Sequence, residues 1–140
     1  MNDKITMSYE VPANDFTRAG EASSSVKSKL KVMGVKPEII RKVAIAMYEG
    51  EINMVIHASG GMINVVVTPE EIDMILKDKG PGIEDIELAM TAGYSTAPDN
   101  IRSLGFGAGM GLPNMKKYTD ELHIDTELGV GTTVTMKVKM

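Results

Sequence analysis

The sequence predicts an α/β fold, a two-layer sandwich in which helices cover one face of a mixed, mostly antiparallel β-sheet. Two observations predict this class. Segments with the two-residue period of a strand are interspersed with segments of helical period, and three connections between strands are short enough for hairpins, which join antiparallel strands. The chain has 140 residues and neither an internal repeat nor a linker. We therefore expect a single domain over residues 1–140.

The first part of the chain is predicted to form one strand and two helices. Apolar residues alternate from Ile5 to Val11, as in a half-buried strand. A helix is expected from Asn14 or Asp15, either of which can cap it, to Met33, with Gly34 as its stop. The apolar positions of this helix are Phe16, Ala19, Ala22 or Ser23, Val26, Leu30 and Met33. A second helix begins at Pro37 and runs to about Ala58.

The rest of the chain is predicted to alternate strands with short helices. The expected strands are Met62–Val67, Ile72–Lys77, Glu121–Thr126 and Thr132–Val138. The expected helices are short, from about Glu84 to Met90 and from near Gly111 to about Tyr118. Residues 91–109 show little periodicity. A loop of this length in a compact domain is often functional.

Composition and charge exclude several classes of protein. Apolar residues make up 43% of the chain and charged residues 24%, which is typical of a globular and not of a disordered protein. The chain has no cysteine, so disulfide frameworks, thiolate zinc sites and cysteine nucleophiles are excluded. A net charge of -4 argues against binding nucleic acid through its phosphates. No apolar run approaches the ~20 residues of a membrane span, and the start lacks the apolar core of a signal peptide. We expect a cytoplasmic protein with no membrane contact.

Three polar residues share one face of the second predicted helix. Glu49, Asn53 and His57 are four residues apart, so at about 100° per residue they fall within an arc of about 80°. This face is either the solvated side of an amphipathic helix or a site, because an amide oxygen beside a carboxylate suits Mg²⁺ and a general base. Glu51 points roughly the opposite way, and we expect it to be solvated or in a surface ion pair.

Glycine is concentrated in one part of the chain, where seven of the 14 glycines lie between residues 80 and 111. The first group forms the sequence Asp78-Lys79-Gly80-Pro81-Gly82 after a predicted strand. An acidic acceptor followed by glycines, which let the backbone approach a ligand, can bind an exocyclic amine while a flat ring lies against the turn. The same residues also form ordinary tight turns, so this motif alone leaves both interpretations open.

The second group of glycines, Gly105-Phe106-Gly107-Ala108-Gly109-Met110-Gly111, leads directly into a predicted helix. Alternating glycines at a helix N-terminus present free N–H groups and the positive end of the helix dipole, which suits phosphates. The alternative is a flexible surface loop. The motif is not a P-loop, and it does not follow a strand as the dinucleotide-binding fingerprint would.

Together these motifs resemble those of a known family. Their order is Glu-x-x-x-Asn-x-x-x-His, Asp-x-Gly-x-Gly, Gly-x-Gly-x-Gly and finally Gly131-Thr132-Thr133. The set resembles the GHKL family of ATP-binding domains (Bergerat, or histidine-kinase-like ATPase, fold), which occurs in type II topoisomerases, mismatch-repair proteins, chaperones and histidine kinases. The resemblance covers nearly the whole chain. Within this family, the chain looks most like the anti-sigma factor serine/threonine kinases of sporulation and stress control. It shares with them a short length, an N-terminal strand and helix, and the histidine after Asn53.

The resemblance implies a role for each matching residue. Glu49 would be the general base toward the attacking hydroxyl, Asn53 would hold Mg²⁺ against the ATP phosphates, and Asp78 would accept the adenine amine. Thr132 would reach the same edge of the adenine through water. The other implied nucleotide-binding residues are Gly80, Gly82 and Ile83 at the base and Gly107, Gly109, Met110 and Gly111 at the phosphates.

The resemblance also implies an ATP lid over about residues 93–107, in which Arg102 could approach the terminal phosphate.

Two further residues of the second predicted helix, Gly50 and His57, lie next to these motif residues or among them. Gly50 stands where alanine would be usual, at a helix cost of ~1 kcal/mol. His57 either helps to form the phosphate site or is a structural histidine, and the sequence leaves both open.

The expected function is therefore that of an ATP- and Mg²⁺-dependent serine/threonine protein kinase. By resemblance it would sequester a sigma factor, phosphorylate a STAS-type anti-anti-sigma protein, and so regulate transcription; a homodimer is a further expectation from the family. The alternative is a nucleotide-gated binding module that transfers no phosphate. A sensor histidine kinase ranks lower, because His57 and His123 are the only histidines and neither lies on a predicted dimerising helix. A eukaryotic-type kinase ranks lower still, because its catalytic-loop and metal motifs are missing.

Overall fold

The computed structural model describes residues 4–12, 19–57, 60–80 and 111–140. Within these ranges, five strands form one sheet in the order β1-β2-β3-β5-β4, and every neighbouring pair is antiparallel. The strands are β1 (Ile5–Val11), β2 (Gly61–Val67), β3 (Glu71–Asp78), β4 (Glu121–Glu127) and β5 (Gly131–Lys139). The predicted α/β class with its largely antiparallel sheet is confirmed.

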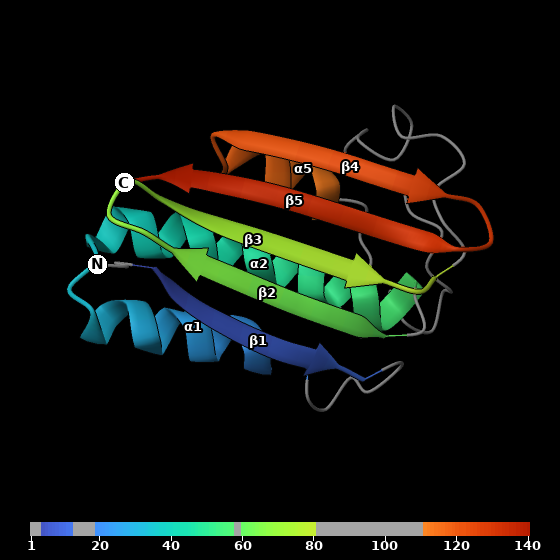
Figure 1. Ribbon diagram of the computed structural model, residues 1–140, viewed down its shortest axis with the longest axis horizontal. Helices are drawn as coiled ribbons and strands as arrows, with labels where there is room; N and C mark the ends of the chain where they lie inside the picture. The colour runs from blue at the N-terminus through green and yellow to red at the C-terminus, as the bar shows by residue number, and fades with distance from the viewer. Residues whose placement is uncertain (1–3, 13–18, 58–59, 81–110) are drawn as a thin grey trace.

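Three described helices cover one face of this sheet (Figure 1). They are α1 (Glu21–Val32), α2 (Pro37–His57) and α5 (Gly111–Lys117). The long helix α2 packs between α1 and α5 and also contacts β1, β3 and β5. It is therefore the central element of the helical layer, while α1 also contacts β1 and α5 contacts β4.

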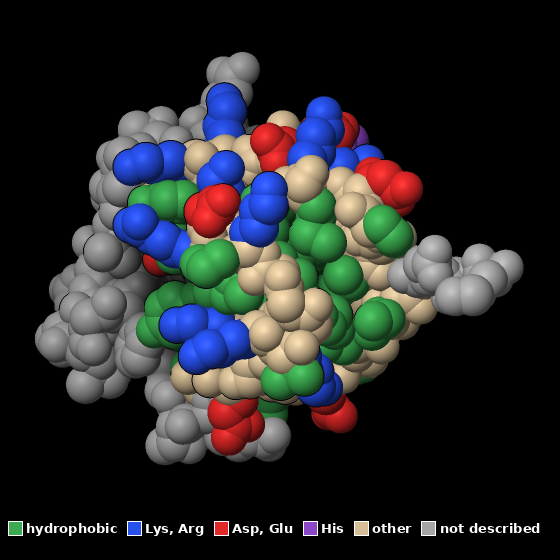
Figure 2. Space-filling model, turned by 90° about the vertical axis from the view of Figure 1, so that its left-hand side faces the viewer, with side chains coloured by type: hydrophobic (Ala, Val, Ile, Leu, Met, Phe, Trp, Pro, Cys, Tyr) green, Lys and Arg blue, Asp and Glu red, His purple; other side chains and the backbone are tan. Residues whose placement is uncertain are grey.

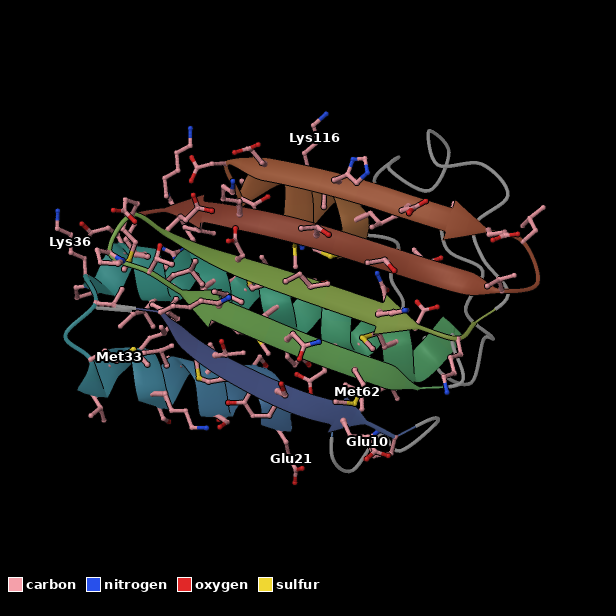
Figure 3. The ribbon with its side chains drawn as sticks, viewed as in Figure 1. Glu10, Glu21, Met33, Lys36, Met62 and Lys116 are labelled. Atoms are coloured by element: carbon pink, nitrogen blue, oxygen red, sulfur yellow. The ribbon has the colours of Figure 1, made fainter. Side chains whose placement is uncertain are left out.

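The core lies between the two layers. The alternating side chains of the strands that point toward the helices are buried, as the two-residue period predicts. The largest fully buried side chains are Leu30, Met47, Ile63, Ile72, Met74, Leu76, Met115 and Met136. The opposite face of the sheet carries mixed polar and apolar residues such as Met62, which Figure 3 shows on that side.

The start of the first helix differs from the prediction. Helix α1 begins at Glu21, because Ala19 and Gly20 form a turn and Gly20 has a left-handed φ of 95° at the N-cap. The expected start at Asn14 or Asp15 is therefore wrong for the helix that contains Val26 and Leu30, and residues 13–18 lie outside the described residues. Met33 caps the C-terminus and is exposed, not part of the core.

The other described elements agree with the prediction within about two residues. Helix α2 runs from Pro37 to His57, and Gly34 follows α1 with a φ of 80°, as expected for a helix stop. The predicted helix over residues 84–90 and the irregular segment 91–109 lie outside the described residues. No helix in the described part of the chain is long and apolar enough to cross a membrane.

The end of the molecule formed by the C-terminus of α1 and the start of α2 is exposed and mixed in character. Val32 is 90% exposed, and Figure 3 places Met33 and Lys36 at this same end. Figure 2 views the molecule from this end and shows hydrophobic side chains among Lys and Arg side chains. Cations therefore interrupt the apolar surface there.

Candidate functional site

The polar face of α2 lies beside α5. Glu49 and Asn53 are both partly exposed, although most of the helix around them is buried. The Nδ2 of Asn114, in α5, donates a hydrogen bond of 3.5 Å to Oε1 of Glu49. The carboxylate of Glu49 thus makes a long hydrogen bond to the helix that starts at Gly111, where the predicted phosphate-binding glycines end.

The surroundings of Glu49 make its carboxyl group a stronger base. Partial burial raises the pKa of Glu49 above the ordinary glutamate value, and the hydrogen bond from Asn114 lowers it by a smaller amount. A raised pKa brings a carboxylate closer to the value that suits a general base near neutral pH. Burial and orientation together suit Glu49 to accept a proton.

Asp78 ends β3, and one oxygen of its carboxylate is held by two backbone groups. Oδ1 accepts hydrogen bonds from the backbone N–H of Gly80, at 2.9 Å, and of Thr132, at 3.0 Å. Within the described part of the chain, Oδ2 accepts no hydrogen bond. Because one oxygen fixes the side chain, the other oxygen is presented in a defined direction to a donor such as an amine.

Two glycines allow the backbone to pack closely around Asp78. A Cβ atom at Gly61 would lie 2.9 Å from Cα of Asp78 and 2.7 Å from Cε of Met54, in α2. A Cβ atom at Gly131 would overlap the carbonyl oxygen of Asp78. Asp78 therefore lies close to the turn of α2 that carries Asn53, so the structure brings the first and second sequence motifs to the same end of the sheet (Figure 1).

Thr132 lies on the inner side of β5 and is only 6% exposed. Its hydroxyl forms a hydrogen bond of 2.8 Å with the hydroxyl of Thr126, while its backbone N–H donates to Asp78. The structure thus links Thr132 to the predicted adenine acceptor through its main chain. Contact of its hydroxyl with adenine through water stays a prediction.

Close packing explains why a glycine stands at position 50 in the middle of α2. It is buried, and a Cβ atom there would overlap Cδ2 of Leu76, in β3, and lie 3.3 Å from Sδ of Met115, in α5. Glycine costs ~1 kcal/mol of helix propensity here, but it allows α2 to pack closely against its neighbours. This contact sets how near the residues on either side of Gly50 come to β3 and α5.

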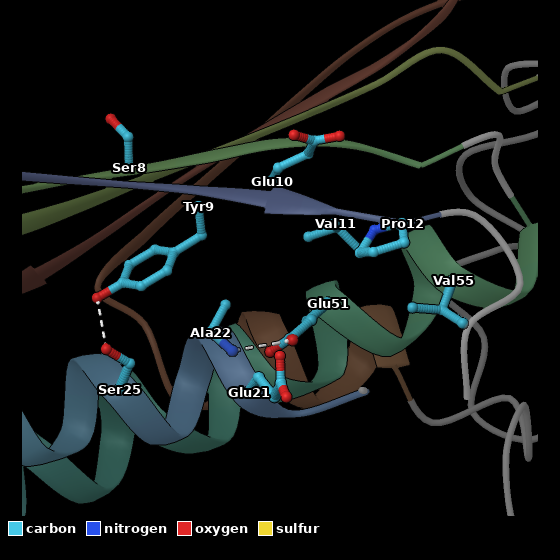
Figure 4. Close-up of a pocket in the computed structure, with 10 residues that line it drawn as sticks. All are labelled: Ser8, Tyr9, Glu10, Val11, Pro12, Glu21, Ala22, Ser25, Glu51 and Val55. Carbon is cyan, nitrogen blue, oxygen red and sulfur yellow. Dashed lines mark hydrogen bonds between the residues drawn. The ribbon is translucent and has the colours of Figure 1, made fainter. Parts of the chain in front are cut away.

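The expectation that Glu51 is solvated is wrong. Glu51 is 3% exposed, and its carboxylate accepts hydrogen bonds from the backbone N–H groups of Gly20, Ala22 and Ser23. These are the orphan donors at the start of α1, where Gly20 has no side chain to cap the helix. The two-residue spacing puts Glu51 on roughly the opposite side of α2 from Glu49, and the start of α1 covers the side that carries Glu51 (Figure 4).

Several predicted site residues cannot be placed. Those outside the described residues are Gly82, Ile83, Arg102, Gly107, Gly109 and Met110, together with the predicted lid. Gly111 is the first residue of α5, and His57 is the last residue of α2. The side chain of His57 is not among those described, so its two interpretations remain open.

The structure adds two residues that the sequence motifs did not include. Asn114 could have been noticed as an amide in the first turns of a short helix directly after the glycine cluster. Glu51 belongs to the i, i+4 row of Met47 and Val55, which are buried at 0% and 1% exposure. An acidic residue in an otherwise buried row needs hydrogen-bond donors, and this signal was present in the sequence.

The side chains on the polar face of α2 suit a metal that is bound together with a nucleotide. Among the described residues, no group of three or more His, Asp or Glu side chains could hold a metal ion. Mg²⁺ in nucleotide sites takes one or two protein ligands and completes its shell with phosphate oxygens and water. The amide of Asn53 and the carboxylate of Glu49, both on α2, fit a metal site of that kind. The fixed carboxylate of Asp78, on β3, suits the base of the nucleotide.

Comparisons with known proteins agree with this arrangement. The Histidine kinase-like ATPase domain family matches residues 13–138. The curated relatives include three proteins named Anti-sigma F factor. The Clostridium acetobutylicum protein is 36% identical over 107 residues, with 73% of this chain and 71% of that protein covered. The Clostridium beijerinckii protein is 33% identical over 127 residues, covering 85% of each. The Clostridium perfringens protein is 29% identical over 146 residues, covering 100% of this chain and 99% of that protein.

A solved structure shares the fold. The crystal structure of the RsbU and RsbW domains of a Mycobacterium tuberculosis protein matches with a TM-score of 0.59 and 16% identity, over 98% of this chain and 32% of that one. This chain thus spans about a third of that longer protein. Given its matching residues and its relatives, the chain belongs to the histidine kinase-like ATPase domain family.

Proposed function

We propose that this protein is an anti-sigma regulatory factor that binds ATP and uses it to phosphorylate a serine or threonine of a protein antagonist. The proposal is supported by family membership and by relatives that are named Anti-sigma F factor. It names as partners a sigma factor, which the protein would sequester, and an anti-anti-sigma protein of the STAS type. It also takes a cytoplasmic location and a homodimer as expectations from the family.

The single observation that carries the ATP-binding part of the proposal is the carboxylate of Asp78. Its Oδ1 is fixed by the backbone N–H groups of Gly80 and Thr132, and the remaining oxygen can accept a hydrogen bond from the 6-amino group of adenine. A flat base would then lie against the turn that follows β3, next to α2. In this proposal the phosphates would lie toward the polar face of α2, which carries Asn53 and Glu49.

The transfer itself would need mainly positioning and one base. Glu49 would accept the proton of the attacking hydroxyl, while the bond between that hydroxyl oxygen and the γ-phosphorus forms and the bond to the ADP oxygen breaks. Asn114 orients Glu49 for this step through its hydrogen bond. Asn53 is the residue proposed to hold Mg²⁺, which neutralises phosphate charge when bound. In the same proposal the glycines up to Gly111 hold the phosphates.

The experiment mixes the purified protein with γ-labelled ATP and the STAS-type protein encoded nearest to it. We expect label on that protein with the wild type and a loss of at least about a hundredfold with Glu49→Ala, because a general base contributes about that much. The matched control is Glu38→Ala, an exposed glutamate in the first turn of the same helix, which should keep the wild-type rate. Unchanged labelling with Glu49→Ala would contradict the role of Glu49.

A second candidate function is a nucleotide-gated binding module without phosphoryl transfer. The hydrogen bonds of Asp78 bear on nucleotide binding and not on phosphoryl transfer, so they support both candidates equally. Glu49 separates them, because its raised pKa and its hydrogen bond from Asn114 suit a base. Nucleotide binding with neither turnover nor labelling of the antagonist would favour the module.

A further inference from the structure

Glu51 is the buried acidic residue of α2, and its carboxylate joins α2 to α1. Oε2 accepts from the N–H groups of Gly20, at 3.0 Å, and Ala22, at 3.1 Å, while Oε1 accepts from the N–H of Ser23, at 3.0 Å. Both oxygens therefore hold the first turn of α1. Hydrogen bonds to an ionised group are stronger and more directional than those between neutral groups, and the helix dipole adds to them.

The same turn of α2 contacts three other elements. Glu49 receives the hydrogen bond from Asn114, in α5, and Gly50 lies against Leu76, in β3, and Met115, in α5. Glu51 holds α1. Three consecutive residues thus connect three different elements to one turn, and this turn carries the proposed catalytic base.

We infer that Glu51 is a positioning residue that sets the rotation of α2 and so orients Glu49 and Asn53 toward the nucleotide. A helix that is held from opposite sides cannot turn about its axis without breaking contacts on one side. Without Glu51, α1 would still pack against α2, but the first turn of α1 would lose the hydrogen bonds that fix it to this turn of α2. The geometry of the metal-binding face then depends on a residue that does not face the site. This inference rests on the proposed function, because it needs nucleotide and metal at that face.

The surroundings of Glu51 allow the inference to be tested in a folded protein. A pocket of about 380 Å³ lies beside the carboxylate, and both Glu51 and Val55 line it (Figure 4). It also carries polar groups, among them the hydroxyls of Tyr9 and Ser25, which are hydrogen-bonded to each other at 3.0 Å. Water that enters this polar pocket can reach the start of α1 and hydrogen-bond the N–H groups that Glu51 would leave.

The experiment titrates wild type and Glu51→Gln with ATP plus Mg²⁺ and, separately, with ADP in EDTA. ADP without metal reports base recognition at Asp78, whereas the gain in affinity from Mg²⁺ reports the geometry of Asn53 and Glu49. We expect Glu51→Gln to bind ATP with Mg²⁺ about tenfold more weakly than the wild type does, a loss within the usual range of coupling between two sites. For ADP in EDTA we expect a loss of less than about twofold. Glu51→Asp, which keeps the charge on a shorter stem, should recover part of the loss.

Amide hydrogen exchange at Gly20, Ala22 and Ser23 checks that Glu51→Gln has released the start of α1, and Glu38→Gln is the matched control on the same helix. An equal loss for both nucleotides would show that Glu51 is merely structural, and unchanged affinity with faster exchange would also overturn the inference. Both results presuppose that the wild type binds nucleotide; a wild type that binds neither ligand contradicts the proposed function instead. If Glu51→Gln does not fold, Glu51→Asp serves for the same comparison.

Discussion

At the scale of single residues, the site depends on carboxylates whose partners are backbone N–H groups or amides. Asp78 uses one oxygen for the protein, where Gly80 and Thr132 donate to it, and in the described part of the chain its other oxygen accepts no hydrogen bond. Glu51 uses both oxygens for the protein. Glu49 has a single amide partner and keeps a raised pKa. The number of internal donors therefore separates the structural acid from the two proposed to contact substrate or nucleotide.

Substitutions at Asp78 should separate folding from recognition. In Asp78→Asn the carbonyl oxygen can still accept from Gly80 and Thr132, but the other position becomes an NH₂ donor that opposes the adenine amine. We expect a folded protein whose affinity for ATP falls at least about tenfold, the equivalent of one lost hydrogen bond. In Asp78→Ala both backbone bonds are lost, so stability should also fall, by about 2 kcal/mol. Calorimetric titration and denaturant unfolding measure the two effects, and full ATP affinity in Asp78→Asn would contradict the assignment.

The raised pKa of Glu49 predicts a pH dependence of stability. Because the folded pKa lies above the unfolded one, the folded state binds more protons between these two values, and the free energy of unfolding falls as pH rises through that window. Glu49→Gln should remove this fall and be the more stable protein at neutral pH. Denaturant unfolding at a series of pH values tests it, with Glu38→Gln as control. An identical pH profile for wild type and Glu49→Gln would show that burial does not disfavour the charge.

Sequence reasoning at this scale identified residues by type and spacing but not by contacts. The four-residue spacing placed Glu49 and Asn53 on one face, and the structure leaves both partly exposed. It misjudged Glu51, because the donors that satisfy it belong to residues about 30 positions earlier in the chain. Such a pairing depends on how two helices pack, which periodicity within one helix does not reveal.

At the scale of elements, α2 organises the helical layer, and Gly50 sets its distance from β3. Gly50→Ala should gain ~1 kcal/mol of helix propensity but force Leu76, which is 2% exposed, out of its position. Overpacking costs about 1–3 kcal/mol, so we expect a net loss of about 1 kcal/mol in the free energy of unfolding.

A compensating variant tests this explanation. Leu76→Val removes a methylene at the point of overlap, so Gly50→Ala with Leu76→Val should be more stable than the two separate losses predict. Denaturant unfolding of the four proteins completes the cycle. Strict additivity would mean that the two side chains do not compete for space.

The start of the first helix was the weakest of the element predictions. The spacing of apolar residues extended the first helix across Gly20, whereas the structure begins it at Glu21. Gly20 has a left-handed φ, and its N–H donates to Glu51. The start of α1 is capped by Glu51 of α2 and not by a residue next to it in the sequence. The local sequence therefore contains no capping residue that would mark where α1 begins.

At the scale of the whole molecule, the fold class followed from patterns that tertiary structure rarely overrides. The strands alternate because one face of the sheet is buried, and the pairs β2–β3 and β4–β5, which short turns were predicted to join, are antiparallel. The order of the strands, with β5 between β3 and β4, rests on long-range pairing and was not predicted. That pairing brings Thr132 to Asp78 and so creates the site from segments 54 residues apart.

Nucleotide binding should stabilise the whole molecule with base selectivity. At a free ATP concentration of about a hundred times Kd, linkage predicts about 2.7 kcal/mol of added stability, measured as a rise in Tm. GTP presents a carbonyl oxygen where adenine presents its amino group, so it meets the Asp78 carboxylate with repulsion and should give little rise. Equal stabilisation by GTP and ATP would contradict base recognition by Asp78.

The most direct measurement is the crystal structure of the protein with a non-hydrolysable ATP analogue and Mg²⁺. The account predicts the adenine amino group within hydrogen-bond distance of Asp78 Oδ2, the metal at Asn53, and Glu49 facing the γ-phosphate. A base bound away from Asp78, or a metal away from Asn53, would contradict it.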